Sequence, residues 1–282
     1  MIQPLLDEIY HDDLADDPHR DQAIREKLRI FSAPFAELLE SPNLNYDDAA
    51  MRFAYLYRFV TGHAKLVAER FAQVPELTTL FQTPERAFIA CLGAGPGSEV
   101  LGLLQAASRI SNIALPEMHV TLLDNHPVWA ESWSPSFSEA QPPFAFSTTY
   151  IPWDVLNDPF SRHKFFRSDW FTMVYFLSDI YAQRDRAIPA LTRLFQHAKP
   201  GARIFYLDHS NPPCTEWMIT LAQGHGFSST QRSSFHRRIV LSDEDTSDLG
   251  VYLERFGTPQ WSDDFVWGIL TKSDPISEAI LL

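Results

Sequence analysis

The chain has 282 residues, and 45% of them are hydrophobic, which predicts a packed globular protein rather than a disordered one. It carries 23 Lys and Arg residues against 36 Asp and Glu residues, for a formal net charge of −13. A surface of this charge repels nucleic acid and anionic membranes as a whole, so bulk nucleic-acid binding is not expected. Two basic clusters are interpreted as ordinary solvated surface rather than binding patches: Arg162, His163, Lys164 and Arg167, and Arg232, His236, Arg237 and Arg238.

The chain contains two cysteines, Cys91 and Cys214. So few cysteines in a chain of this length indicate a reducing compartment without a disulfide framework, and no Cys/His cluster has the spacing of a zinc site. Residues 1–17 lack the apolar core of a signal peptide, and no apolar run approaches the length of a membrane span. We therefore expect a cytoplasmic protein, with the nucleus or nucleolus as alternatives, and no membrane partner.

The organisation of the chain changes near residue 86. Residues 1–85 are predicted to form a helical extension, in which Asp47 caps a helix whose apolar residues recur at helical spacing as far as Phe71. From Ala87 onward strands and helices alternate, which favours a parallel sheet with covering helices. We predict an α/β domain over residues 86–272 and a tail over 273–282.

Within the α/β domain the apolar runs predict parallel strands over 87–92, 118–123, 144–150, 170–177 and 204–207. Helices are expected after the first of these strands, around 188–195 and over 216–223. The sequence Lys199-Pro200-Gly201 has Pro and Gly in the order that a type II turn prefers. Two late strands are expected, one within 235–241 and one over 265–271.

A glycine-rich turn, Cys91-Leu92-Gly93-Ala94-Gly95-Pro96-Gly97-Ser98-Glu99, joins the first strand to a helix. Glycines at Gly93, Gly95 and Gly97 let a ligand approach the backbone closely, and free amides at the helix start can meet its polar groups. The spacing is Gly-x-Gly-x-Gly rather than the Gly-x-Gly-x-x-Gly of dinucleotide-binding folds. This difference favours S-adenosylmethionine (SAM) over NAD as the cofactor.

The other candidate residues follow the remaining strands, because ligands of open parallel sheets bind at the carboxyl ends of the strands. Asp124 is placed to accept hydrogen bonds from a ribose diol, although a turn-capping role is the alternative. The sequence Trp153-Asp154-Val155 either flanks an adenine or forms a structural loop. Asp179 is a candidate to orient an acceptor or take its proton, and Tyr181 is a second catalytic candidate. Asp208 and His209 are weaker candidates.

Glu99 lies in the first turn of the predicted helix, two residues past the last glycine. A carboxylate there stabilises the helix by complementing its dipole, which is the simpler interpretation. The functional interpretation is that Glu99 reaches the ammonium group of the cofactor.

Taken in order, the glycine motif, Asp124, Trp153-Asp154-Val155, the Lys199-Pro200-Gly201 turn and the Gly226-Phe227 step resemble class I SAM-dependent methyltransferases over roughly residues 85–272. The resemblance implies a three-layer sandwich around a seven-stranded, mostly parallel sheet with an antiparallel final hairpin. It implies that the product form of the cofactor is S-adenosyl-L-homocysteine. It implies methionine-end contacts from Gly93, Gly95 and Gly97, ribose contacts from Asp124 and adenine contacts near Trp153, Asp154 and Val155. We also predict cofactor contacts from Ala94, Asn125 and Phe176, and from Glu99, for which backbone carbonyls are the alternative.

Two departures from the family pattern matter. The family often carries an acidic residue two positions before the first glycine, where this chain has Cys91. The Asn-Pro-Pro-aromatic signature of amino-group methyltransferases is replaced after the fourth strand by Leu177-Ser178-Asp179-Ile180-Tyr181. Asn211-Pro212-Pro213 follows the fifth strand instead and is not interpreted as that motif.

The predicted function is therefore methyl transfer from SAM to an unidentified acceptor, either a small molecule, a protein or RNA, with the helical extension helping to close the site. A non-catalytic SAM-binding regulator of the same fold is the alternative, and a NAD-dependent oxidoreductase is disfavoured by the glycine spacing. A weaker likeness links Gly93–Glu99 and the helix over 46–67 to the fungal large-subunit rRNA uridine-N3 methyltransferase-like group. The net charge speaks against transferring the RNA substrate from that group.

Overall fold

A computed structural model describes residues 2–32, 44–130, 141–157 and 164–274. Its centre is a seven-stranded sheet with the order β3-β2-β1-β4-β5-β7-β6. The strands are β1 (Ala87–Leu92), β2 (Glu117–Asp124), β3 (Ala145–Pro152), β4 (Trp170–Val174), β5 (Arg203–His209), β6 (Phe227–Ile239) and β7 (Trp261–Lys272). Only β7 runs antiparallel to its neighbours β5 and β6. The sheet that the methyltransferase resemblance implied is thereby confirmed.

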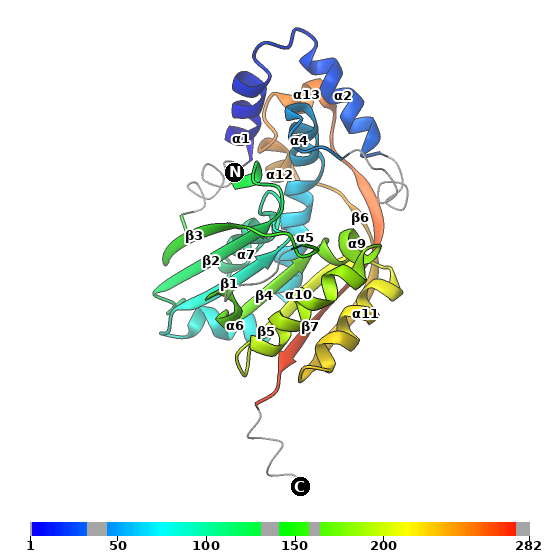
Figure 1. Cartoon of the computed structure of the whole chain (residues 1–282). Helices are drawn as coiled ribbons and strands as arrows, with labels where there is room; N and C mark the ends of the chain where they lie inside the picture. Colours follow the sequence, from blue (N-terminus) through cyan, green and yellow to red (C-terminus); the bar gives the residue numbers. More distant parts are fainter. Residues whose placement is uncertain (1, 33–43, 131–140, 158–163, 275–282) are drawn as a thin grey trace.

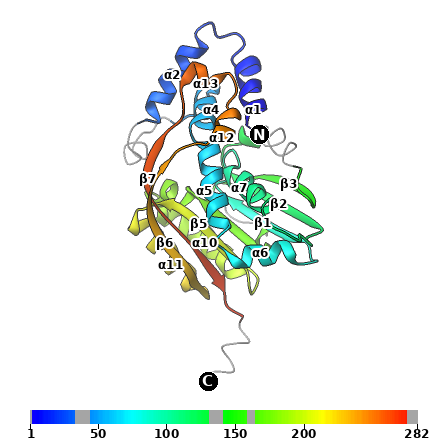
Figure 2. The ribbon, with the colours of Figure 1, turned by 180° about the vertical axis from the view of Figure 1, so that it is seen from behind.

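Helices cover both faces of the sheet, as Figures 1 and 2 show from opposite sides. One face carries α9 (Phe176–Tyr181), α10 (Arg184–His197) and α11 (Pro212–Gln223), and the other carries α5 (Thr61–Phe71), α6 (Pro75–Gln82) and α7 (Ser98–Ala107). Alternate residues of β1 show why: Ile89 and Cys91 belong to one apolar cluster, whereas Ala90 and Leu92 belong to the other. A strand buried on both faces needs apolar residues at every position, which is why β1 reads as a continuous apolar run.

Further helices form a cap above one end of the sheet (Figure 1). The cap contains α1 (Gln3–Glu8), η1 (Ile9–Asp13), α2 (Arg20–Ile30), α4 (Ala49–Tyr55), η2 (Leu56–Val60), α12 (Asp243–Ser247) and α13 (Tyr252–Phe256). The last two helices lie between β6 and β7 in the sequence. They join the N-terminal helices through an aromatic cluster, in which the Tyr252 ring lies 5.2 Å from Tyr10 and 5.0 Å from Phe53. The predicted helical extension is thus completed by a segment from the other end of the chain.

Three sequence-based boundaries are wrong. The helix cap is Asp48 rather than Asp47, because the Asp48 carboxylate accepts the amides of Ala50 and Met51. Strand β4 ends at Val174 rather than residue 177, because Tyr175 takes a left-handed φ of 55° and a helix follows. Strand β6 begins at Phe227, well before residue 235, because its polar edge-strand sequence has no apolar signal.

The basic residues of the second cluster are paired with neighbours. Arg232 lies 2.6 Å from Glu216, His236 lies 2.9 Å from Asp264, and Arg237 binds both carboxylate oxygens of Glu69. These contacts agree with the interpretation as ordinary surface. In the first cluster, residues 162–163 lie outside the described residues, as does most of the predicted tail.

Both cysteines are buried and have free thiols. Among the residues described, no helix combines the length and the apolar character needed to cross a membrane.

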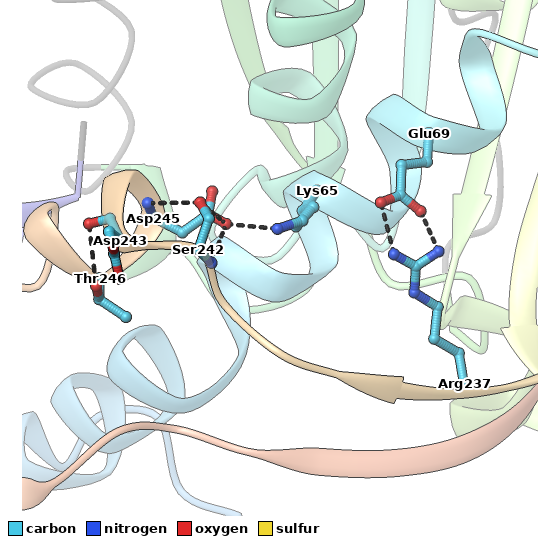
Figure 3. Close-up of polar contacts among 7 residues, drawn as sticks. All are labelled: Lys65, Glu69, Arg237, Ser242, Asp243, Asp245 and Thr246. Carbon is cyan, nitrogen blue, oxygen red and sulfur yellow. Dashed lines mark hydrogen bonds and ion pairs between the residues drawn. The ribbon is translucent and has the colours of Figure 1, made fainter.

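Two ion pairs join α5 to the β6–α12 segment (Figure 3). The Lys65 ammonium lies 2.7 Å from the Asp245 carboxylate, and Arg237 on β6 pairs with Glu69. Asp245 also closes a capping box, since its carboxylate accepts the Ser242 amide while the Ser242 hydroxyl accepts the Asp245 amide. Asp245 therefore links the base of the cap to the helix that packs on the sheet.

We predict that Asp245→Asn lowers the free energy of unfolding by about 1 kcal/mol, because it removes an ion pair and half of a capping box. Urea denaturation measures this change. Asp243→Asn is the matched control, because Asp243 is exposed and the Thr246 hydroxyl binds only its backbone carbonyl. Equal losses in the two variants would contradict the assigned role of Asp245.

Candidate functional site

A cavity of about 350 Å³ lies at the carboxyl ends of β1, β2, β3 and β4, beneath the cap. This edge includes the point where the chain, having added β2 and β3 on one side of β1, returns to add β4 on the other. Such a switch in strand order is where open α/β sheets bind ligands. The predicted site residues that line the cavity are Gly93, Gly95, Asp124, Asn125, Trp153, Asp154, Val155, Phe176 and Asp179.

The glycine turn after β1 brings backbone to the cavity wall. Gly93, Gly95 and Gly97 have φ values of 64°, 47° and 77°, in the left-handed region that side chains disfavour. A Cβ atom added to Gly93 would lie 2.4 Å from the Phe176 ring, whereas one added to Gly95 would meet no atom within 4 Å. Gly93 is therefore required by packing and by φ, whereas at Gly95 only φ disfavours a side chain, because the space beside its Cα atom is open.

Asp124 ends β2 with its carboxylate at the cavity wall. One carboxylate oxygen accepts the amide of Gly95 at 2.8 Å, and the other accepts the amide of His126 at 2.8 Å. Burial raises the pKa of Asp124, and these amides oppose the rise because they stabilise the ionised form. Since each carboxylate oxygen has a second lone pair, the group retains acceptor capacity for hydroxyl donors.

An aromatic wall stands beyond β3. Trp153 and Phe176 stack with ring centres 6.4 Å apart, and Trp153 is anchored by its amide, which donates to the Asp124 carbonyl. Asp154 accepts the amide of Leu156 at 2.8 Å and also accepts from the side chain of Asn157. Asp154 thus shapes the loop in addition to lining the cavity.

The turn after β4 positions Asp179 on the first helical turns of α9. The fully buried Asp208 carboxylate at the end of β5 accepts the amides of Leu177 and Ser178 at 2.9 and 3.1 Å. It thereby satisfies the first amides of α9 after the strained Tyr175. Asp179 is exposed to the cavity, and its removal from bulk solvent, with Asp208 and Asp124 nearby, raises its pKa to about 8.

The cap supplies the remaining wall. Tyr46 and Tyr55 line the cavity with Trp129, and the three rings have centres 5.1 to 5.8 Å apart. His126 lies 5.3 Å from Tyr46. Burial raises the pKa of both tyrosines, so both stay neutral hydrogen-bonding phenols at physiological pH.

Four predicted residues do not line the cavity: Ala94, Gly97, Glu99 and Tyr181. Ala94 donates its amide to the Leu123 carbonyl, and Gly97 is the N-cap residue of α7. The Tyr181 ring packs against Trp217 and Arg184 on the outer side of α9. His209, a weaker candidate, pairs with Asp263 at 2.5 Å.

Glu99 is buried beneath the glycine turn, with 3% of its surface exposed. Its carboxyl group lies beside the Cys91 thiol, and one of its oxygens has no hydrogen-bond partner. Burial, with Asp124 adding to the effect, raises the pKa of Glu99 to about 8. Glu99 is therefore largely protonated at neutral pH in the structure as described.

Sequence reasoning missed the cavity residues Tyr46, Tyr55, His126, Trp129 and Tyr175. The tyrosines belong to the cap, and no residue spacing indicates which cap side chains meet the sheet edge. His126 and Trp129 come shortly after Asp124. Aromatic residues directly after the carboxylate that is predicted to bind ribose were therefore a signal available in the sequence.

No protein-family model matches the chain, and no curated protein is significantly similar to it. Similar solved structures include a proposed RNA methyltransferase from Pyrococcus horikoshii (16% identity, 75% of this chain and 83% of that one, TM-score 0.45). The N-methyltransferase NodS from Bradyrhizobium japonicum, solved with S-adenosyl-L-homocysteine, is 12% identical (75% and 100%, TM-score 0.41). The [4+2]-cyclase SpnF is also 12% identical (77% and 94%, TM-score 0.42). At these values the chemistry has to be argued from the residues of this chain.

We predict that Gly93→Ala destabilises the protein more than Gly95→Ala. Both variants force a side chain into a left-handed φ, at a cost of about 1 kcal/mol or more, but only Gly93→Ala also pushes against Phe176. Urea denaturation of both variants measures the difference. A larger loss in Gly95→Ala would show that the Phe176 contact is not what restricts Gly93.

We predict that Glu99→Gln flattens the dependence of stability on pH. Between about pH 4.5 and 8 the folded state keeps a proton on Glu99 that the unfolded state releases, so wild-type stability falls as pH rises, by at most roughly 1.4 kcal/mol per pH unit from this group. The glutamine variant lacks this fall, which urea denaturation at pH 5, 6.5 and 8 measures. The exposed Glu85→Gln variant is the control, and wild-type slopes in both variants would contradict the burial of a protonated Glu99.

Proposed function

We propose that this protein binds SAM at the carboxyl edge of the sheet and transfers its methyl group to an acceptor held beneath the cap. The observation that carries the proposal is that one cavity contains both the glycine turn, with open space beside the Cα atom of Gly95, and a buried carboxylate with spare acceptor capacity at Asp124. These are the two features needed to hold a nucleoside joined to a polar tail. The ordered sequence motifs support the same cofactor.

The cavity fits a ligand of this kind. Its volume of about 350 Å³ lies in the ordinary range for small-molecule sites, and its walls combine aromatic rings with a few polar groups. Asp124 would accept hydrogen bonds from the ribose hydroxyls, and Trp153 and Phe176 would flank the adenine. Gly93 and Gly95 would lie along the methionine portion.

Glu99 would take the role of the acidic residue that the family often carries at the position of Cys91. Because its carboxyl group lies beside Cys91, the chain places an acid from α7 next to the place where the family often carries one on β1. An ammonium group in that region would favour ionised Glu99 and remove the cost of a buried, incompletely bonded carboxyl.

When bound, SAM supplies a methyl group made electrophilic by the sulfonium charge. The residues of this chain would exclude water and align the acceptor, which is where most of the rate would come from. Asp179 is suited to orient the acceptor: with a pKa of about 8 it is mostly protonated at neutral pH and able to donate a hydrogen bond. As a base it would become effective only as the pH approaches 8.

The cavity walls favour a flat acceptor group that is uncharged or cationic. Its acidic residues are Asp124, Asp154 and Asp179, and no Lys or Arg lines it within the part of the chain described. Aromatic rings bind flat groups and cations well, whereas a phosphate here would meet three acidic side chains and, among the described lining residues, no Lys or Arg.

We predict micromolar binding of S-adenosyl-L-homocysteine and no binding of NAD, measured by isothermal titration calorimetry. Asp124→Asn should weaken the binding about tenfold or more, because it replaces a charge-assisted acceptor by a neutral amide. Asp185→Asn, an exposed site at the start of α10, is the control for the change in charge. Wild-type affinity in Asp124→Asn would refute the assigned ribose contact.

Turnover separates the enzyme from the non-catalytic alternative. Labelled SAM is incubated with amine-bearing and aromatic acceptor panels, and an enzyme transfers label while a regulator only binds. Binding of NADH in place of S-adenosyl-L-homocysteine would instead favour an oxidoreductase.

A further inference from the structure

A second cavity of about 260 Å³ lies within the cap, away from the sheet edge. It is formed by α2, by η2 and by the segment around the end of α13. Helices α2 and α13 lie together at the top of the molecule in both Figure 1 and Figure 2. Its lining includes four arginines, Arg25, Arg29, Arg58 and Arg255. No Asp or Glu is among the lining residues in the described part of the chain.

The arginines differ in what holds them. Arg25 donates to the Arg255 carbonyl at 3.1 Å and lies over the Phe256 ring, and Arg255 donates to the Tyr10 hydroxyl and lies 3.5 Å from Asp21. Among the described residues, the guanidinium groups of Arg29 and Arg58 have no hydrogen-bond or ion-pair partner. The Nε atom of Arg58 is also buried without a partner.

Arg58, which is half-buried, is costly to the protein without a ligand, whereas Arg25, Arg29 and Arg255 are exposed. A guanidinium that is partly removed from water and lacks an anion loses solvation without compensation, and burial accordingly lowers the pKa of Arg58. Four like charges around one cavity also repel each other. The chain has a net charge of −13 and pairs many of its other basic side chains, yet among the described residues only Arg255 of these four arginines lies within ion-pair distance of a carboxylate.

We propose that this cavity binds a small ligand that carries a phosphate or diphosphate group. Guanidinium groups match phosphate oxygens in geometry and charge, and arginine is the residue most suited to such pairing. Phe256 and the ring of Tyr57 give the cavity an apolar side for the remainder of the ligand, while the Tyr57 hydroxyl is already bonded to the Gly257 carbonyl at 2.5 Å. The proposal concerns a site separate from the SAM cavity and does not depend on methyl transfer.

The test is calorimetric titration of the full-length protein with inorganic pyrophosphate in metal-free buffer, at 50 and 150 mM salt. We expect saturable 1:1 binding that weakens at the higher salt concentration. Arg58→Gln and Arg29→Gln should each weaken it about tenfold. Neither variant should unfold at a lower temperature than the wild type, because neither side chain has a hydrogen-bond or ion-pair partner in the described structure.

Arg86→Gln is the matched control. Arg86 is an exposed arginine that pairs with Glu117 and does not line this cavity, and its loss changes the net charge equally. Retained affinity in this variant supports a built site. Equal weakening in all three variants, or the absence of saturable binding by the wild type at 50 mM salt, overturns the proposal. Binding of S-adenosyl-L-homocysteine by the same variants reports on the other cavity and is expected to be unchanged.

Discussion

Two buried carboxylates at the ends of strands hold the functional edge of the sheet in shape. Asp124 on β2 accepts an amide from the turn that follows the neighbouring β1, and Asp208 on β5 accepts two amides from the turn that follows the neighbouring β4. Both turns contain left-handed residues, so their amides point away from ordinary ladder partners. Without these acceptors, the amides would be buried and unpaired, and the cavity walls would lose their geometry.

The same arrangement gathers acidic groups in a poorly solvated region. Asp124, Asp179 and Glu99 each have a raised pKa, because removal from bulk solvent disfavours their ionised forms, and Asp124 adds to the rise at both Asp179 and Glu99. A cationic ligand reverses this balance by favouring ionisation. An acidic cavity with aromatic walls is therefore electrostatically suited to a sulfonium and an ammonium group, which is why the site and the proposed cofactor agree physically.

The cap contributes side chains to two cavities whose lining residues carry opposite charge. Its lower side presents Tyr46 and Tyr55 to the acidic cavity, while η2, which follows Tyr55 directly, contributes Tyr57 and Arg58 to the arginine-lined one. The hydroxyl of Tyr57 is bonded to the backbone at the end of α13, so the N-terminal helices and the β6–β7 insertion form one packed unit.

The sequence by itself determined the α/β architecture, the glycine turn and the place of Asp124 at the end of a strand. Continuous apolar strands and glycines at left-handed positions are local features, so they can be recognised in the sequence. Cavity lining by Trp153, Asp154, Val155 and Asp179 also followed, because parallel strands end at a common edge. Only the tertiary structure decided the rest. Tyr46, Tyr55 and the four cap arginines reach their cavities through packing between segments up to 230 residues apart, as between Arg25 and Arg255, and no local pattern records such contacts. The end of β4 likewise depended on Asp208, a carboxylate from another strand that satisfies the strained turn after Val174.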